Sequence, residues 1–177
     1  HDVIVRPRAE DGEDVARTRW RQVHVEERIR LAVAPRHADG TLSLHGDLGP
    51  WNVLVDGDRW FAIDWDSTHR GEAAWEIAYC LHTFCSRGPA RALAPAEAVR
   101  RMRAFATGYG LDDDDLATAV GLVPERLLEV ACFLHRRADE GVPGFVRLVA
   151  EGHDARWRTI AEHAAAQLPA WLDAVTS

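Results

Sequence analysis

The sequence predicts an α+β fold that is mainly α, in which a helical body carries one β-hairpin. Two observations predict it. Two apolar runs of strand length, "WNVLV" and "RWFAID", flank Asp56-Gly57-Asp58, and Asp-Gly between such runs is a strong hairpin signal. From residue 72 to the end, apolar residues recur at helical spacing almost throughout.

Length and composition limit the class of protein. The chain has 177 residues, enough for one domain and short for two. Hydrophobic residues make up 47% and charged residues 28%, close to ordinary globular usage. A net charge of −7 disfavours binding to phosphate backbones, so we expect no nucleic-acid partner. No apolar run approaches the ~18 residues of a membrane span and no signal peptide opens the chain, so we expect no membrane partner and a cytoplasmic location.

The first 44 residues predict a helical lead-in. Residues 13–33 place apolar side chains loosely at helical spacing, and Glu26 and Arg30 form a favourable i,i+4 pair. Residues 35–40, "PRHADG", have turn chemistry. Residues 41–44 then form a short strand or an extended approach to the loop that starts at His45.

The rest of the chain predicts the hairpin and four or five helices. The helical segments are 72–85, 94–110 and 124–141, with one or two more over 145–174. Four consecutive acids, residues 112–115, precede an apolar helix and are explained by capping and by the helix dipole. The cysteines Cys80, Cys85 and Cys132 form no Cys-x-x-Cys pair and lie in apolar runs, so we expect reduced thiols.

Three polar residues are spaced around the hairpin in a way that points to phosphoryl transfer. Asp47 and Asn52 have the Asp-x-x-x-x-Asn spacing of a kinase catalytic loop, in which Asp is the base and Asn a magnesium ligand. Asn52 starts one strand and Asp64 ends its partner, so an antiparallel hairpin brings them side by side. One carboxylate with one amide oxygen suits Mg²⁺, which keeps waters and substrate phosphates as its other ligands.

The stretches "HGDLGPWNVLV", "FAIDWD", "AAWEIAY" and "EGHD" resemble the aminoglycoside phosphotransferase family, small-molecule kinases with a protein-kinase-like fold. The resemblance implies that Asp47 is the catalytic residue and that Asn52 and Asp64 hold magnesium. It also implies that His45 buttresses the catalytic loop. Glu76 stands where the family usually has Asp, and the longer acid is expected to brace the same loop. ATP is implied as the phosphate donor and Mg²⁺ as the cofactor.

The resemblance also sets the expected domain organisation. Residues 45–177 correspond to the C-terminal catalytic lobe, and the relation of residues 1–44 to the family stays open. The chain has no Lys to contact ATP phosphates, no Gly-rich loop, and His1 rather than Met at its start. We therefore expect the ATP-gripping N-terminal lobe to be absent from this chain and supplied by a missing segment or a partner chain, and no ATP-binding residue is assigned.

The leading hypothesis is an ATP- and magnesium-dependent O-phosphotransferase acting on a small-molecule hydroxyl, aminoglycoside-like or other, which the isolated chain need not perform alone. The alternative is a degenerate, non-catalytic relative that binds a ligand or a partner protein. A metal-dependent phosphohydrolase is a third hypothesis. Trp51 is a candidate residue to line the nucleotide or acceptor pocket. Asp66 is expected to cap the following segment or to form a local hydrogen bond. Four acids suit a cationic acceptor or simple solubility: Asp139, Glu140, Glu151 and Asp154.

Overall fold

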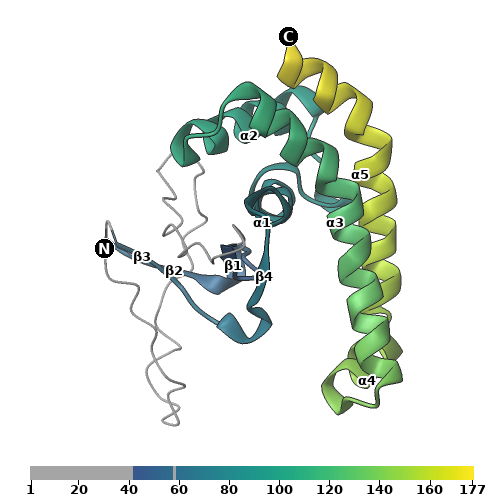
Figure 1. The fold of residues 1–177 in the computed structure, drawn as a ribbon. Coiled ribbons are helices and arrows are strands. Elements are labelled where there is room, and N and C mark those ends of the chain that lie inside the picture. The colour runs from purple at the N-terminus through teal and green to yellow at the C-terminus, as the bar shows by residue number, and fades with distance from the viewer. Residues whose placement is uncertain (1–41, 58) are drawn as a thin grey trace.

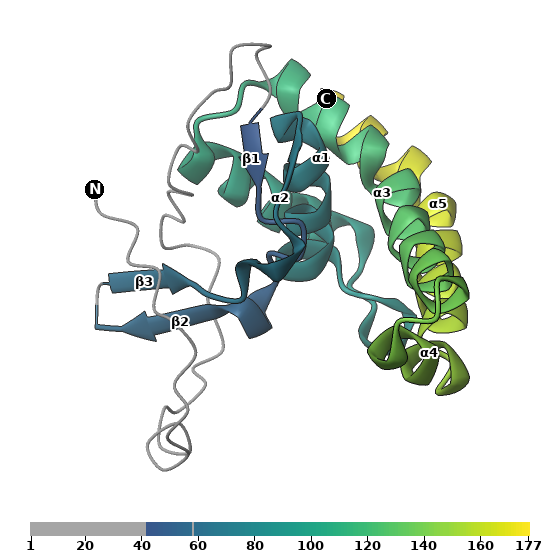
Figure 2. The same cartoon turned by 60° about the horizontal axis from the view of Figure 1, so that its bottom comes forward.

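The computed structural model describes residues 42–57 and 59–177 (Figure 1). The helix expected over 13–33 and the turn at 35–40 lie outside the described residues. The strands lie on one side of the molecule, α1 (Ala73–Cys80) lies in the middle, and two long helices, α3 (Asp113–Asp139) and α5 (His153–Thr176), run side by side along the other (Figures 1 and 2). The described part is mainly helical with small antiparallel sheets, as the sequence predicts.

The predicted hairpin is confirmed. Strands β2 (Val53–Asp56) and β3 (Arg59–Ala62) pair antiparallel, with Val53 opposite Ala62 and Asp56 opposite Arg59. Figure 2 shows the hairpin extending away from the helices. Its register decides which residues of the adjoining loops become neighbours.

Beside the one predicted hairpin, the described residues contain a second two-stranded sheet, of which the sequence indicated only a short strand within residues 41–44. β1 (Leu42–Leu44) pairs antiparallel with β4 (His69–Gly71), so that Leu44 lies opposite His69. Each strand has three residues, too few for alternation to show, and β4 is largely exposed. In the sequence β1 precedes the hairpin and β4 follows it, so their pairing places the loop after β1 beside the residues that follow β3.

The helices agree with the predicted segments, with one difference at α3. α1 continues into a π-helical turn over Leu81–Ser86, and α2 (Pro95–Tyr109) ends at Gly110 in the left-handed conformation that glycine allows. α4 (Pro143–Ala150) and α5 are the two tail helices. Single turns of 3₁₀-helix cover Pro50–Asn52, Trp65–Ser67 and Pro89–Arg91.

α3 joins two stretches that look separate in the sequence. Asp112 caps it by accepting a 2.8 Å hydrogen bond from the backbone N–H of Asp115, as expected of the acidic run. The helix then continues through Pro124, because a row of apolar residues on both sides of this proline is buried in the core. Burial of that row offsets the hydrogen bond that proline cannot donate.

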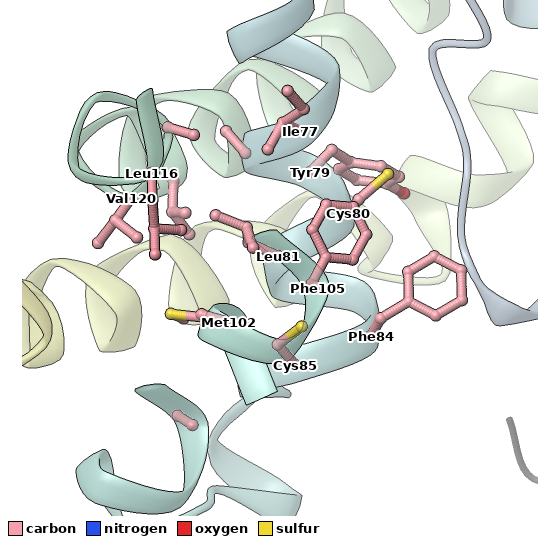
Figure 3. Packing of buried hydrophobic residues seen from close by; sticks show 14 of the residues in the cluster. Ile77, Tyr79, Cys80, Leu81, Phe84, Cys85, Met102, Phe105, Leu116 and Val120 are labelled. Atoms are coloured by element: carbon pink, nitrogen blue, oxygen red, sulfur yellow. The ribbon is translucent and has the colours of Figure 1, made fainter. Parts of the chain in front are cut away.

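The core forms where α1 and the π-helical turn that follows it pack against α3 and α2, with α5 packed on α3. Figure 3 shows its centre, and its largest fully buried aliphatic side chains are Leu81, Met102, Leu116, Val120, Val123, Leu127 and Val175. Cys80 and Cys85 lie in this core, Cys132 is half-buried, and all three are free thiols. Burial raises the pKa of Cys85 to about 12, so this thiol stays protonated.

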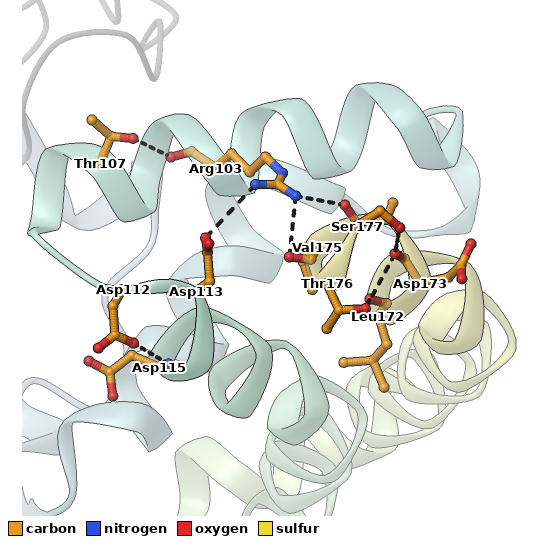
Figure 4. Close-up of polar contacts among 11 residues, drawn as sticks. Arg103, Thr107, Asp112, Asp113, Asp115, Leu172, Asp173, Val175, Thr176 and Ser177 are labelled. Carbon is orange, nitrogen blue, oxygen red and sulfur yellow. Dashed lines mark hydrogen bonds and ion pairs between the residues drawn. The ribbon is translucent and has the colours of Figure 1, made fainter.

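Arg103 on α2 holds the C-terminal end of α5 (Figure 4). Its Nη2 donates to the carbonyl oxygens of Ala174 at 2.9 Å and Val175 at 3.2 Å. Its Nη1 lies 3.9 Å from a carboxylate oxygen of Asp113, at the start of α3. A cation at a helix C-terminus satisfies orphan carbonyls and matches the helix dipole, so one side chain joins three helices.

We expect the unfolding free energy to fall by about 3 kcal/mol as the pH drops from 7 to below 4, because His82 is buried as a neutral imidazole. Burial, with a contribution from His163, lowers its pKa from 6.5 to about 4. The unfolded chain therefore takes up a proton between these values while the folded chain does not. Urea unfolding of the wild type and of His82→Gln at several pH values measures this loss.

The His82→Gln variant should lose most of the pH dependence between pH 6.5 and 4, whereas His69→Gln, at an exposed position, should retain it. Equal pH dependence in the wild type and His82→Gln would contradict the assignment.

No helix among the described residues has the length and apolar character needed to cross a membrane.

Candidate active site

The loop between β1 and β2, residues 45–52, is held from both sides at Gly46. The N–H of Gly46 donates to Oε2 of Glu76 on α1 at 2.9 Å, and its carbonyl accepts from Nη2 of Arg126 on α3 at 2.7 Å. Gly46 has φ +84°, and a Cβ there would lie 2.4 Å from the carbonyl oxygen of Ser67. Only glycine fits this conformation and this approach, so the His-Gly-Asp sequence places a rigid turn directly before Asp47.

His45 ties the loop to the residue that precedes Asp64. It is buried, and its Nε2 lies 2.9 Å from the carbonyl oxygen of Ile63. Its Nδ1 accepts from the N–H of Asp47 at 3.3 Å. An accepting Nδ1 leaves the ring proton on Nε2, which then donates to Ile63. The ring also packs on Trp65, with centroids 4.6 Å apart. His45 therefore contacts both the loop that carries Asp47 and the segment that leads to Asp64, and both of its ring nitrogens are engaged in hydrogen bonds.

Asp47 is half-buried and accepts hydrogen bonds at both carboxylate oxygens. Oδ1 accepts from the hydroxyl of Tyr79 at 2.6 Å. Oδ2 accepts from Nδ2 of Asn52 at 3.1 Å and from Nε1 of Trp51 at 3.4 Å. Burial, and then the charge and hydrogen bond of Asp47, raise the pKa of Tyr79 far above its usual range, so its hydroxyl remains a donor. The carboxylate is thus held in one orientation by its surroundings.

Asn52 is buried and turns its amide nitrogen toward Asp47. Nδ2 donates to the backbone oxygen of Asp47 at 2.9 Å as well as to Oδ2. Because the two amide atoms lie on opposite sides of Cγ, the oxygen of Asn52 faces away from Asp47. The oxygen is the atom that a hard cation would use.

Asp64 lies next to Asn52 through the hairpin register. The N–H of Ile63 donates to the backbone oxygen of Asn52 at 3.0 Å, and Asp64 follows directly. Asp64 is exposed and has φ +63°, ψ +62°, a left-handed conformation that non-glycine residues adopt mainly when they are Asn or Asp. Such backbone outliers cluster at functional sites.

The donor set around Asn52 and Asp64 fits Mg²⁺ chemically. It offers one anionic and one neutral oxygen, which leaves the remaining positions to waters and phosphate oxygens. No group of three or more His, Cys, Asp or Glu side chains that could hold a metal ion occurs within residues 42–57 and 59–177. A site here would depend on substrate oxygens for its completion.

Sequence reasoning missed two residues of the site, Tyr79 and Arg126. Tyr79 belongs to the "AAWEIAY" stretch, but its helical position marks it only as a core residue. Arg126 lies 80 positions from Gly46 and reads locally as a solvated arginine on a helix. Its guanidinium is in fact buried, 4.6 Å from the ring centroid of Tyr79. No local signal could have placed it in the site.

Glu76 reaches the loop with one oxygen only. Oε2 accepts from Gly46, while Oε1 is buried and has no hydrogen-bond partner among the described residues. The Nε of Arg126 is likewise buried and unpaired within that part of the chain. Burial lowers the pKa of Arg126, and the electrostatic effects of Tyr79 and then of Glu76 oppose that shift only in part.

Three of the four acids near α4 lie beside Arg or His side chains. Glu140 pairs with Arg137, and Asp154 lies 3.1 Å from His135. Glu151 lies 3.8 Å from Arg147. These pairs lessen the support that the acidic residues lend to a cationic acceptor. Trp51 is 45% exposed, a large aromatic side chain open to solvent beside Asp47.

Comparison with known proteins adds one match. A model of the phosphotransferase enzyme family matches residues 4–111, from residue 4 ahead of the loop at His45 to just beyond the end of α2. The search of curated proteins and the search of solved structures both returned no match. Because the matched segment spans more than half of the sequence and contains the whole loop and hairpin, the chain belongs to the phosphotransferase enzyme family.

Proposed function

We propose that this protein transfers a phosphoryl group from ATP to a hydroxyl of a small molecule, with magnesium, and that residues 45–177 act as a kinase-like C-terminal catalytic lobe. The observation that carries the proposal is the Asp47 carboxylate. Donors from α1 and from its own loop hold it, and the side chain of Asn52 lies against it. Family membership supplies the reaction class.

Asp47 is the residue that accepts the proton of the acceptor hydroxyl. A general base must lie within hydrogen-bond reach of the proton it removes, and its orientation must be held while it does so. Tyr79, Trp51 and Asn52 supply that orientation. The developing oxygen nucleophile then forms a bond to the γ-phosphorus of ATP as the bond to the β-bridging oxygen breaks, and ADP leaves.

Asn52 and Asp64 are the residues that would hold magnesium. When bound, the ion would neutralise charge on the phosphate oxygens. The carboxamide oxygen of Asn52 faces away from Asp47, and Asp64 is exposed beside it, so neither competes with the proton transfer at Asp47. His45 connects the loop of Asp47 to the segment that carries Asp64, because it contacts both the N–H of Asp47 and the carbonyl of Ile63.

The test is acceptor-dependent turnover of the native gene product that carries this chain. MgATP is incubated with a panel of sugars, amino alcohols, nucleosides and aminocyclitols, and ADP release is measured with and without each compound. We expect ADP to form only with certain acceptors, together with a phosphomonoester visible by ³¹P NMR, and to stop when EDTA is added.

Two results would contradict the proposal. Equal ADP release without any acceptor, with inorganic phosphate as the second product, would indicate hydrolysis. Binding of a panel compound without any turnover of ATP would indicate a non-catalytic relative.

A further inference from the structure

We propose that Tyr79, braced by Arg126, is a positioning residue that occupies Oδ1 of Asp47 and so leaves Oδ2 as the oxygen that meets the acceptor hydroxyl. This inference rests on the proposed function. It goes beyond it by assigning separate tasks to the two oxygens of Asp47 and by bringing two residues from the helical core into the reaction.

The contact between Tyr79 and Asp47 is short and shielded from water. The hydroxyl donates to Oδ1 at 2.6 Å, and only 1% of Tyr79 is exposed. A hydrogen bond to a charged group is short and stronger than a neutral one. Since solvent cannot replace the phenol, Oδ1 stays occupied through the catalytic cycle.

Arg126 holds the ring of Tyr79 in place and polarises it. Its guanidinium lies 4.6 Å from the centroid of Tyr79 and 5.7 Å from that of Trp75. A cation over an aromatic face draws on the electron density of the ring, which strengthens the hydroxyl as a donor. Arg126 also donates to the carbonyl of Gly46, so it braces the loop and the phenol together.

The donors at Oδ2 differ from Tyr79 in exposure and distance. Trp51 is 45% exposed and its Nε1 lies 3.4 Å from Oδ2, a long contact. Asn52 approaches from the buried side at 3.1 Å. An acceptor hydroxyl arriving from solvent can replace the indole N–H, because that contact is the weakest and most exposed of the three. The two oxygens are therefore unequal before any substrate binds.

The experiment compares Tyr79→Phe with Tyr109→Phe in the native gene product. The chain has two tyrosines, and Tyr109 lies on α2, stacked on Phe105, so the same change there is a matched control. We expect Tyr79→Phe to lower kcat by roughly 10- to 100-fold with an unchanged KM for MgATP, the effect of losing one hydrogen bond to a charged group. Tyr109→Phe should leave both constants unchanged.

Arg126→Lys provides a second variant that keeps the charge and loses the planar stacking and fork geometry. We expect it to lower kcat in the same direction as Tyr79→Phe. A kcat of Tyr79→Phe within twofold of the wild type would overturn the proposal, as would a parallel fall in kcat for Tyr109→Phe.

A double-mutant cycle keeps this inference separable from the proposed function. Unfolding constants of the wild type, Tyr79→Phe, Asp47→Asn and the double variant should show a coupling of about tenfold or more between the two side chains. Coupling without phosphoryl transfer in the wild type would refute the proposed function and leave Tyr79 as a residue that only holds Asp47. Additive effects would refute the positioning role whatever the activity.

Discussion

Replacing Asp64 by Ala is expected to abolish magnesium-dependent phosphoryl transfer, lowering kcat/KM by more than about a thousandfold. Asp64 would supply the carboxylate oxygen that the protein contributes to the proposed magnesium site, next to the neutral oxygen of Asn52. Without this carboxylate the magnesium ion would not be held, and the charge on the ATP phosphates would go uncompensated. ADP release measured over a range of magnesium concentrations tests this, and added magnesium should restore little of the rate.

The backbone at Asp64 makes a second variant necessary. Ala at φ +63° costs about 1 kcal/mol in unfolding free energy, because it lacks the short polar side chain by which Asp and Asn offset the strain of this left-handed conformation. Asn tolerates this conformation, so Asp64→Asn should lose activity while it retains stability. Asp66→Ala, two residues on in the same 3₁₀ turn and also exposed, is the matched control and should retain both.

Near-normal turnover in Asp64→Ala and Asp64→Asn would contradict the assignment of Asp64. Equal losses in Asp64→Asn and Asp66→Ala would show that the turn matters as a whole rather than the carboxylate of Asp64. Isothermal titration with Mg²⁺ and ATP separates a loss of metal binding from a loss of the chemical step.

Replacing Asp47 by Asn is expected to lower kcat by about 10²- to 10⁴-fold, the usual contribution of a general base. The KM for MgATP should change little, because the proposed ligands Asn52 and Asp64 are untouched. Initial rates at saturating ATP and acceptor measure the effect. Asp56→Asn, at the exposed end of β2, removes one carboxylate from the same hairpin and should leave the rate unchanged.

The same variant should also destabilise the fold. Three donors point at the carboxylate of Asp47, and an amide has only one accepting oxygen. The NH₂ group of the amide would face at least one of these donors. A buried donor left without an acceptor costs about 1–3 kcal/mol in unfolding free energy. Wild-type kcat in Asp47→Asn would contradict the role of Asp47, and unchanged stability would contradict the hydrogen-bond pattern described for it.

The hairpin and the second sheet show which strands the local sequence pattern can predict and which it cannot. β2 and β3 are adjacent in the chain, and their apolar runs around Asp56-Gly57 were enough to predict them. β1 and β4 are three residues each and come from opposite sides of the hairpin, so their pairing depends on the fold around them. Likewise, α3 runs through Pro124 because the core buries a continuous apolar row.

The sequence by itself determined the class of the protein, the hairpin, most of the helices, and the candidate residues Asp47, Asn52 and Asp64, because spacing along the chain carries that information. Only the tertiary structure decided what holds them. Tyr79 meets Asp47 across 32 positions, and Arg126 meets Gly46 across 80. Contacts of that separation arise when helices pack against a loop, and neither partner marks the other in the sequence.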